Sequence, residues 1–383
     1  MNKSTTPVDA LTRLSSYTDF VKIKKLAQAH ETPFYALNLS NVKSNAVMFK
    51  NAIPNSEVFY AVKVNPDVEI IKELHSQGIG FDVASSGEVL LCKSLGISPD
   101  KMIFSNPVKK PSEIKKAFQE GINFFVFDNY FELDKLAANA PNSKVYLRLC
   151  VYGENSKINL NEKFVAMQDE AVDLMCEALK KGLNPVGLAF HVGMQCLSAE
   201  SYVNAIEKCS QINDELKKQG IHIEFVNIGG GFPVKYPGDN FNLNDYFKKI
   251  NEAIRTYFPE TKVFLEPGSG MVGDSTSIVF SVIGKNFRGG KTWYYVDESI
   301  YSSFLNYALY GQNYSFYTLK KGELENCILA GRTCDSLDIL NKDVKLPKLE
   351  IGDIVITRNA GAYTRTFNTN FNSFEAVKTV YFR

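Results

Sequence analysis

Residues 58–63 read VFYAVK, a short apolar run that ends on a lysine. Short apolar runs of this kind are typical of buried parallel strands. Seven similar runs follow, separated by stretches with helical periodicity. The eight predicted strands are Val58–Lys63, Phe81–Ser85, Met102–Ser105, Phe124–Asp128, Val145–Leu149, Leu188–Val192, Phe225–Gly229 and Val263–Pro267. Eight strand–helix units over about 230 residues predict an α/β fold, a (β/α)₈ barrel.

Beyond Gly268 the pattern changes to alternating, β-rich segments. They are Ser277–Ile283, Thr292–Val296, Ser315–Leu319, Asn326–Leu329, Asp353–Thr357 and Ala376–Tyr381. We expect them to form a second domain, with the early segment Pro33–Leu39 paired back onto it. The predicted organisation is an N-terminal segment (1–40) that partly joins the β domain, a barrel (41–270) and a C-terminal β domain (271–383).

Composition narrows the class of protein. The chain has 383 residues, 45% hydrophobic and 22% charged, which suits a globular protein of two domains. A formal net charge of +1 argues against binding to nucleic acid or to an anionic membrane through a global field. No apolar run is long enough to cross a bilayer, and the polar start MNKSTTPVDA lacks a signal-peptide core, so we predict a cytoplasmic protein.

Cysteine and histidine are scattered along the chain. The seven cysteines show no C-x-x-C spacing and no dense framework, which indicates reduced thiols. The four histidines form no metal-ligand pattern. We therefore expect no metal site.

The predicted strand ends hold most of the reactive side chains. Barrel enzymes place their reacting groups at the C-terminal ends of the strands. Here those ends carry Lys63, Asp82, Asn106, Asp128, Arg148, His191, Gly229–Gly231 and Glu266. A lysine, a flat ring, a glycine loop and a carboxylate are the parts that a pyridoxal 5'-phosphate (PLP) site needs.

Each of these residues also has a plainer interpretation. An unpaired ammonium at Lys63 would be unfavourable inside a barrel, and imine formation removes that penalty, but a lone lysine often snorkels from a strand end. Glu266 could hold a pyridine nitrogen protonated or form an ordinary ion pair. His191 could stack on the cofactor ring or fill the core.

Two further groups suit an anion. The IGGGFP run beginning at Ile228 could expose N–H groups to a phosphate, or it could be a tight turn. Arg148 suits an oxyanion, or it could form a buried pair with Asp82 or Glu88.

Eight motifs together resemble the fold-type III, PLP-dependent amino acid decarboxylases, the alanine racemase-like family of ornithine, diaminopimelate and arginine decarboxylases. The resemblance spans nearly the whole chain. In order, the motifs are YAVKVN around Lys63, FDVASSGE at 81–88, SNPVK at 105–109, FHVG around His191, IGGGFP at 228–233, EPG at 266–268, TCDSLD at 333–338 and GAYT at 361–364. Any one of them is weak, but eight in the family's order are specific.

The resemblance implies a role for each matching residue. Lys63 would bind PLP as a Schiff base, His191 would stack on the ring, Gly229, Gly230 and Gly231 would bind the phosphate, and Glu266 would pair with the pyridine nitrogen. Asp82, Glu88 and Arg148 would support them. The resemblance also implies a head-to-tail homodimer in which TCDSLD of one chain completes the site of the other. Cys334 would then supply a proton after CO₂ leaves, Asp335 would face the distal end of the substrate, and Tyr363 would reach the phosphate.

The departures from the family pattern lie near the ligand. Ser269 follows EPG where relatives have a phosphate-binding arginine, and Met194 replaces a serine. Relatives have a second substrate-binding aspartate in the segment YSSFLNYALYG (301–311), where this chain has only Tyr310 and Gly311. Arg332 and Arg365 add positive charge. Fewer carboxylates and more cations favour an anionic substituent.

We therefore predict a decarboxylase that acts on an ornithine-type diamino acid or on a derivative acylated at its distal amine, such as the N-citrylornithine of carboxylate siderophore synthesis. Solvated surface arginines are the alternative interpretation of the departures. Competing functions are a plain L-ornithine or L-lysine decarboxylase of polyamine synthesis, a racemase of the same barrel family, and a catalytically silent, decarboxylase-like regulatory protein.

Overall fold

The computed structural model describes residues 17–151, 162–234, 241–311 and 314–383, which divide into two compact units. The barrel unit holds the described residues from Val42 to Val234 and from residue 241 to Met271. The β unit holds those up to Asn41 and from Val272 onward. No helix in the described ranges is long and apolar enough to cross a membrane.

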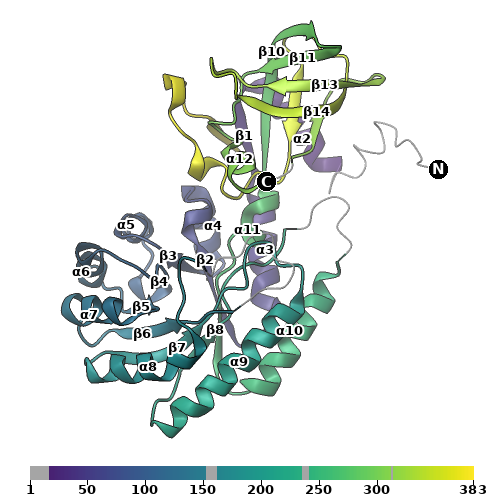
Figure 1. Cartoon of the computed structure of the whole chain (residues 1–383). Coiled ribbons are helices and arrows are strands. Elements are labelled where there is room, and N and C mark those ends of the chain that lie inside the picture. Colours follow the sequence, from purple (N-terminus) through teal and green to yellow (C-terminus); the bar gives the residue numbers. More distant parts are fainter. Residues whose placement is uncertain (1–16, 152–161, 235–240, 312–313) are drawn as a thin grey trace. The chain divides into compact units, whose positions relative to one another are not determined.

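Eight parallel strands close into a barrel, as the sequence predicts (Figure 1). They are β2 Ser56–Ala61, β3 Gly80–Val83, β4 Met102–Phe104, β5 Phe124–Phe127, β6 Lys144–Arg148, β7 Asn184–Ala189, β8 Phe225–Asn227 and β9 Lys262–Leu265. The helices of this part of the chain are α3 Leu39–Ala52, α4 Val68–Ser76, α5 Ser86–Ser94, α6 Pro111–Gln119, α7 Tyr130–Asn139, α8 Ala171–Lys180, α9 Ala199–Lys218, α10 Leu243–Tyr257 and the single turn α11 Ser269–Val272. Short 3₁₀ turns lie at Val62–Val64, Pro99–Lys101, Gln168–Glu170 and Gly273–Ser275.

Several of the barrel helices begin shortly after a strand ends, at a residue whose side chain caps the helix. The Asp67 carboxylate accepts from the N–H groups of Glu69 and Ile70 at the start of α4, and the Ser85 hydroxyl accepts from Glu88 at the start of α5. Such caps satisfy N–H groups that the helix leaves without partners. Inside the barrel, the rings of Phe225 and Phe264 stack with their centroids 4.0 Å apart. The barrel is thus a packed core.

The β unit contains an eight-stranded sheet. Its strands are β1 Phe34–Asn38, β10 Thr276–Arg288, β11 Lys291–Val296, β12 Phe316–Thr318, β13 Leu324–Ala330, β14 Ile339–Pro347, β15 Ile354–Thr357 and β16 Lys378–Phe382. It also holds α2 Tyr17–Ala29, α12 Leu305–Tyr310 and 3₁₀ turns at Arg365–Phe367 and Phe371–Ser373. The predicted pairing of the early segment is confirmed, because β1 pairs antiparallel with β10 and parallel with β16.

Candidate active site

Lys63 lies in the 3₁₀ turn that follows β2, at the C-terminal end of the barrel. Its Nζ is 2.8 Å from Asp82 Oδ2, and 46% of its side-chain surface is exposed. The expectation of an unpaired ammonium inside the barrel is therefore wrong, because β2 ends at Ala61 and the turn carries Lys63 past the core to a carboxylate on β3. Asp82 itself is 1% exposed, and its Oδ1 is buried without a hydrogen-bond partner among the described residues.

Glu266 follows β9, and two donors hold one of its oxygens. Ser105 Oγ and Asn227 Nδ2 each donate to Oε1 over 2.7 Å. Burial and then the charge of Asp82 raise the pKa of Glu266 to about 7, although the ammonium of Lys63 opposes them. A cationic group at this carboxylate would favour its ionised form.

The glycine loop after β8 leaves no room for side chains. Gly229 and Gly231 have φ values of +67° and +96°, and a Cβ on Gly229 would lie 2.1 Å from the carbonyl oxygen of Phe190. Gly229 donates to Asn227 Oδ1 over 2.9 Å. The N–H groups of Gly230 and Gly231 donate to no acceptor in the described ranges. Such a loop suits close approach by a phosphate.

His191 lies beside this loop. Its Nδ1 accepts from the N–H of Gly193 over 3.0 Å, and a Cβ on Gly230 would be 3.3 Å from Nε2. Burial, with help from the charges of Arg148 and Lys63, lowers the pKa of His191 to about 3. The ring is therefore neutral and held in one orientation at physiological pH.

Arg148 and Glu88 complete the charged groups of the barrel end. Arg148, at the end of β6, forms no ion pair with Asp82 or Glu88 in the described structure, and its Nε is buried without a hydrogen-bond partner there. Burial lowers the pKa of Arg148. Glu88 Oε2 accepts from the N–H of Ala84 over 2.7 Å, and burial raises the pKa of Glu88 to about 7. The buried pair with Asp82 or Glu88, which was the alternative interpretation of Arg148, is thus not formed in the described structure.

Two other strand-end residues serve local structure. Asn106 Nδ2 donates to the carbonyl of Ala84, and Asp128 accepts from the N–H of Val165. Two departures from the family pattern, Ser269 and Met194, form no part of this network of contacts. The Ser269 hydroxyl bonds to no residue in the described ranges, and nothing in the structure explains Met194.

Sequence reasoning missed the residues that hold Glu266. Ser105 donates to Glu266 and also lies 2.8 Å from the hydroxyl of Tyr146. Asn227 is fully buried at the end of β8. Their position at strand ends was the available signal, but three separate strands had to meet before their partner could be known.

The β unit holds the other predicted residues. Cys334 is exposed, with its Sγ 3.7 Å from Asn372 Oδ1. The carboxylate of Asp335 accepts from the N–H of Leu337 over 2.9 Å and from the Tyr301 hydroxyl, and both bonds keep the pKa of Asp335 below its usual value. Asp335 is therefore ionised at neutral pH.

Arg332 is more enclosed than we expected of a cation that would bind an anionic group of the substrate. The guanidinium of Arg332 lies 4.3 Å from the ring centre of Phe374. The backbone N–H of Arg332 donates to the backbone carbonyl of the buried residue Glu298. Burial raises the pKa of Glu298, and the charge of Arg332 is one of the effects that oppose this rise. Arg332 thus has an aromatic ring and a carboxyl group as neighbours within its own unit.

Three aromatic rings of the same unit lie close to one another. The ring centres of Tyr310 and Tyr363 are 6.5 Å apart, and Phe367 lies 5.8 Å from the first and 5.5 Å from the second. Tyr363 has a φ of +55°. Arg365 is exposed on the adjoining turn.

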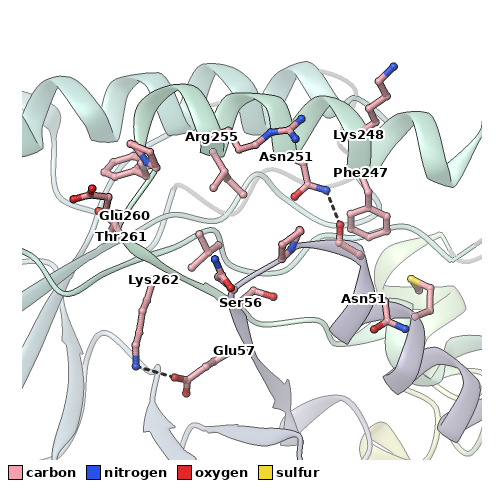
Figure 2. A pocket seen from close by; sticks show the side chains of 18 of the residues that line it. Asn51, Ser56, Glu57, Phe247, Lys248, Asn251, Arg255, Glu260, Thr261 and Lys262 are labelled. Atoms are coloured by element: carbon pink, nitrogen blue, oxygen red, sulfur yellow. Dashed lines mark hydrogen bonds and ion pairs between the residues drawn. The ribbon is translucent and has the colours of Figure 1, made fainter.

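A cavity of about 1150 Å³ lies at the other end of the barrel strands (Figure 2). Ser56 and Glu57 at the start of β2, and Lys262 at the start of β9, line it together with Asn251 and Arg255 of α10. None of the predicted site residues borders this cavity. The predicted site residues lie instead at the C-terminal ends of the strands.

Gly229→Ala is expected to weaken PLP binding about tenfold or more and to lower the free energy of unfolding by about 2 kcal/mol, because the added methyl meets a carbonyl oxygen at a positive φ. Cofactor titration and thermal unfolding measure the two effects. Gly96→Ala is the matched control, since Gly96 also has a positive φ of +80° but has no atom near its Cβ position. Equal losses in both variants would contradict the prediction.

The barrel end has the groups that PLP requires. A lysine, a glycine loop with unbonded N–H groups, a neutral imidazole and a buried carboxylate lie at neighbouring strand ends, while Asp82 Oδ1 and Arg148 Nε are buried without partners among the described residues. Fold and donor set define a PLP-dependent barrel enzyme.

Comparison with known proteins places the chain more narrowly. Residues 39–273 match the family model described as "Pyridoxal-dependent decarboxylase, pyridoxal binding domain". The lysine/ornithine decarboxylase of Selenomonas ruminantium is 37% identical over 94% of this chain and 92% of its own length. A solved structure of an SrLDC mutant in complex with PLP has a TM-score of 0.92 and 37% identity, and covers 94% of each chain. That of a lysine/ornithine decarboxylase from Vibrio vulnificus with cadaverine has a TM-score of 0.90 and 32% identity, over 96% and 99%.

The chain therefore belongs to the pyridoxal-dependent decarboxylase family of fold-type III. It is a PLP-dependent amino acid decarboxylase.

Proposed function

We propose that the chain decarboxylates an amino acid with a distal ammonium group, L-ornithine or L-lysine. The observation that carries this proposal is the ionised carboxylate of Asp335, which Leu337 and Tyr301 hold in place by hydrogen bonds. An ionised carboxylate favours a cationic substrate end. The similarity to a lysine/ornithine decarboxylase supports the same substrate class.

Within the barrel, we assign the cofactor to Lys63, with Glu266 facing the pyridine nitrogen, the N–H groups of Gly230 and Gly231 facing the phosphate, and His191 on the ring. When bound, PLP supplies the electron sink for the bond to the departing carboxylate. Glu266 would keep the ring nitrogen protonated. Asp82, with its second oxygen unbonded in the described structure, keeps Lys63 oriented.

Cys334, Asp335 and Tyr363 would act from the β unit of a second copy in a head-to-tail homodimer. Cys334 would supply its thiol proton to the α-carbon of the substrate after CO₂ leaves. Its exposure, and that of Leu337 in the same motif, supports a role against a partner chain. Tyr363 would contact the cofactor phosphate, a contact that Ser269 would supplement in place of the usual arginine.

An acylated substrate such as N-citrylornithine is the second candidate. The exposed Arg365 favours it, as does the absence of a second aspartate from the segment 301–311, where the exposed Tyr310 lies. Arg332 favours it less, because its guanidinium packs on the ring of Phe374 and its Nε is buried. We therefore place the free diamino acid first.

CO₂ release from L-ornithine, D-ornithine, L-lysine, L-arginine, diaminopimelate and N-citrylornithine tests the proposal. We expect the highest kcat/KM with L-ornithine or L-lysine, and Asp335→Asn should lower it about tenfold, mostly through KM, because a hydrogen bond to a charged group is lost. Asp343→Asn is the control, since Asp343 is an exposed carboxylate on β14 paired with Lys291. Higher kcat/KM with N-citrylornithine would favour the second candidate, and inversion without CO₂ release would contradict both.

A further inference from the structure

Asn227 uses both ends of its side-chain amide and has no exposed surface. Nδ2 donates to Glu266 Oε1 over 2.7 Å, while Oδ1 accepts from the N–H of Gly229 over 2.9 Å. One planar group therefore joins the carboxylate after β9 to the first glycine of the loop after β8.

The two oxygens of Glu266 are in different situations. Oε1 accepts from both Asn227 and Ser105, and because the Ser105 proton points to Oε1, the hydroxyl of Tyr146 must donate to Ser105. Oε2 has no hydrogen-bond partner in the described ranges. The two donors thus fix the rotation of the carboxylate and leave Oε2 for a ligand.

The glycine loop is equally constrained at its first residue. Gly229 has a φ of +67°, its N–H is held by Asn227, and its carbonyl accepts from the N–H of Glu266 over 2.8 Å. The next two residues, Gly230 and Gly231, carry the unbonded N–H groups. A change at Asn227 therefore acts on the carboxylate and on the loop together.

We propose that Asn227 is a positioning residue that holds Glu266 Oε2 and the N–H groups of Gly230 and Gly231 in one fixed relation, so that the ring end and the phosphate end of the cofactor are set together. Ser105 acts on the ring end alone. This inference rests on the proposed roles of Glu266 and of the glycine loop, and it predicts different losses for the two variants.

The test compares the affinity for PLP with that for pyridoxal, which lacks the phosphate, in the full-length chain after cofactor removal. Each lost hydrogen bond is expected to weaken binding about fivefold. Ser105→Ala should weaken both ligands about fivefold, whereas Asn227→Ala should weaken pyridoxal about fivefold and PLP about 25-fold. Asn213→Ala is the matched control, because Asn213 is a buried asparagine on α9 of the same unit, and it should change neither affinity.

A second readout is the pH dependence of kcat in the reconstituted enzymes. Both donors stabilise the ionised carboxylate, so Asn227→Ala and Ser105→Ala should each move the acidic limb of the profile to higher pH. The charged groups that face Glu266, Asp82 on β3, Lys63 after β2 and Arg148 on β6, are the same in every variant. Asn213→Ala should leave the limb in place.

An unchanged ratio of PLP to pyridoxal affinity in Asn227→Ala would overturn the proposal, as would an equal fall of that ratio in Ser105→Ala. If Asn227→Ala fails to unfold cooperatively on heating, Asn227→Ser replaces it, with the same expected ratio. Failure of the proposed function looks different: wild-type protein would then bind PLP with an affinity that Glu266→Gln leaves unchanged.

Discussion

Lys63→Ala is expected to lower kcat for decarboxylation by roughly 10²–10⁴-fold and to remove the visible absorbance of the bound cofactor. The reason is that Lys63 is proposed both to bind the cofactor and to move a proton when product leaves. Asp82 would lose its ion pair as well and would stay buried with two unpartnered oxygens among the described residues. Absorbance spectra and steady-state CO₂ release measure the two effects.

Lys72→Ala is the control, because Lys72 is an exposed lysine paired with Glu69 on α4 of the same unit. Mixing Lys63→Ala protein with Cys334→Ala protein adds a test of the shared site. In a head-to-tail dimer, mixed pairs contain one intact site and should regain activity that neither variant has alone. Full activity of Lys63→Ala would contradict the assignment of Lys63, and absence of recovery on mixing would contradict the shared site.

Glu266→Gln is expected to lower kcat by roughly 10²–10³-fold, because an amide cannot balance the positive charge that the protonated ring nitrogen carries. In the wild-type enzyme, the ionised form of Glu266 is the active one, so activity should fall as the pH drops and the carboxylate becomes protonated. The acidic limb due to Glu266 should be absent from the profile of Glu266→Gln. A variant with the wild-type limb would show that another group titrates.

The same substitution should stabilise the cofactor-free protein. The pKa of Glu266 is about 7 in the folded chain against 4.5 for a free side chain, so the folded state binds the proton more tightly. Stability is then lost as the pH rises from 4.5 to 7, and glutamine avoids this loss. Denaturant unfolding at pH 8 should give a free energy of unfolding higher by roughly 3 kcal/mol in Glu266→Gln. Reduced stability of the variant would contradict the raised pKa.

The barrel was predictable because each strand has a short, mostly apolar centre and the helices between strands have a clear period. The strand ends were less exact: the predicted first strand ran to Lys63, but β2 ends at Ala61. Strand β14 was missed, because its ILNKDVKLP run mixes exposed lysine and aspartate with buried positions and breaks the alternation. The β-propensity of these residues could not reveal a strand that forms because it pairs antiparallel with β13.

The candidate site was predictable in its reactive groups and less so in their partners. Lys63, His191, the glycine loop and Glu266 stood out because each is chemically distinctive at a strand end. Their contacts depend on residues far apart in sequence, as the bonds from Ser105 and Asn227 to Glu266 illustrate. Sequence order says which side chains are near a strand end, while only the closed barrel decides which donor meets which acceptor.

Strand β1 has a consequence for how the chain matures in the cell. It lies at residues 34–38, whereas its two partners are at 276–279 and 378–382. At a translation rate of roughly 5–20 residues per second, β1 leaves the ribosome roughly 10–50 s before β10 exists. The barrel is then synthesised in full while β1 lacks both of its partner strands, so the β unit can form only after the barrel sequence is complete.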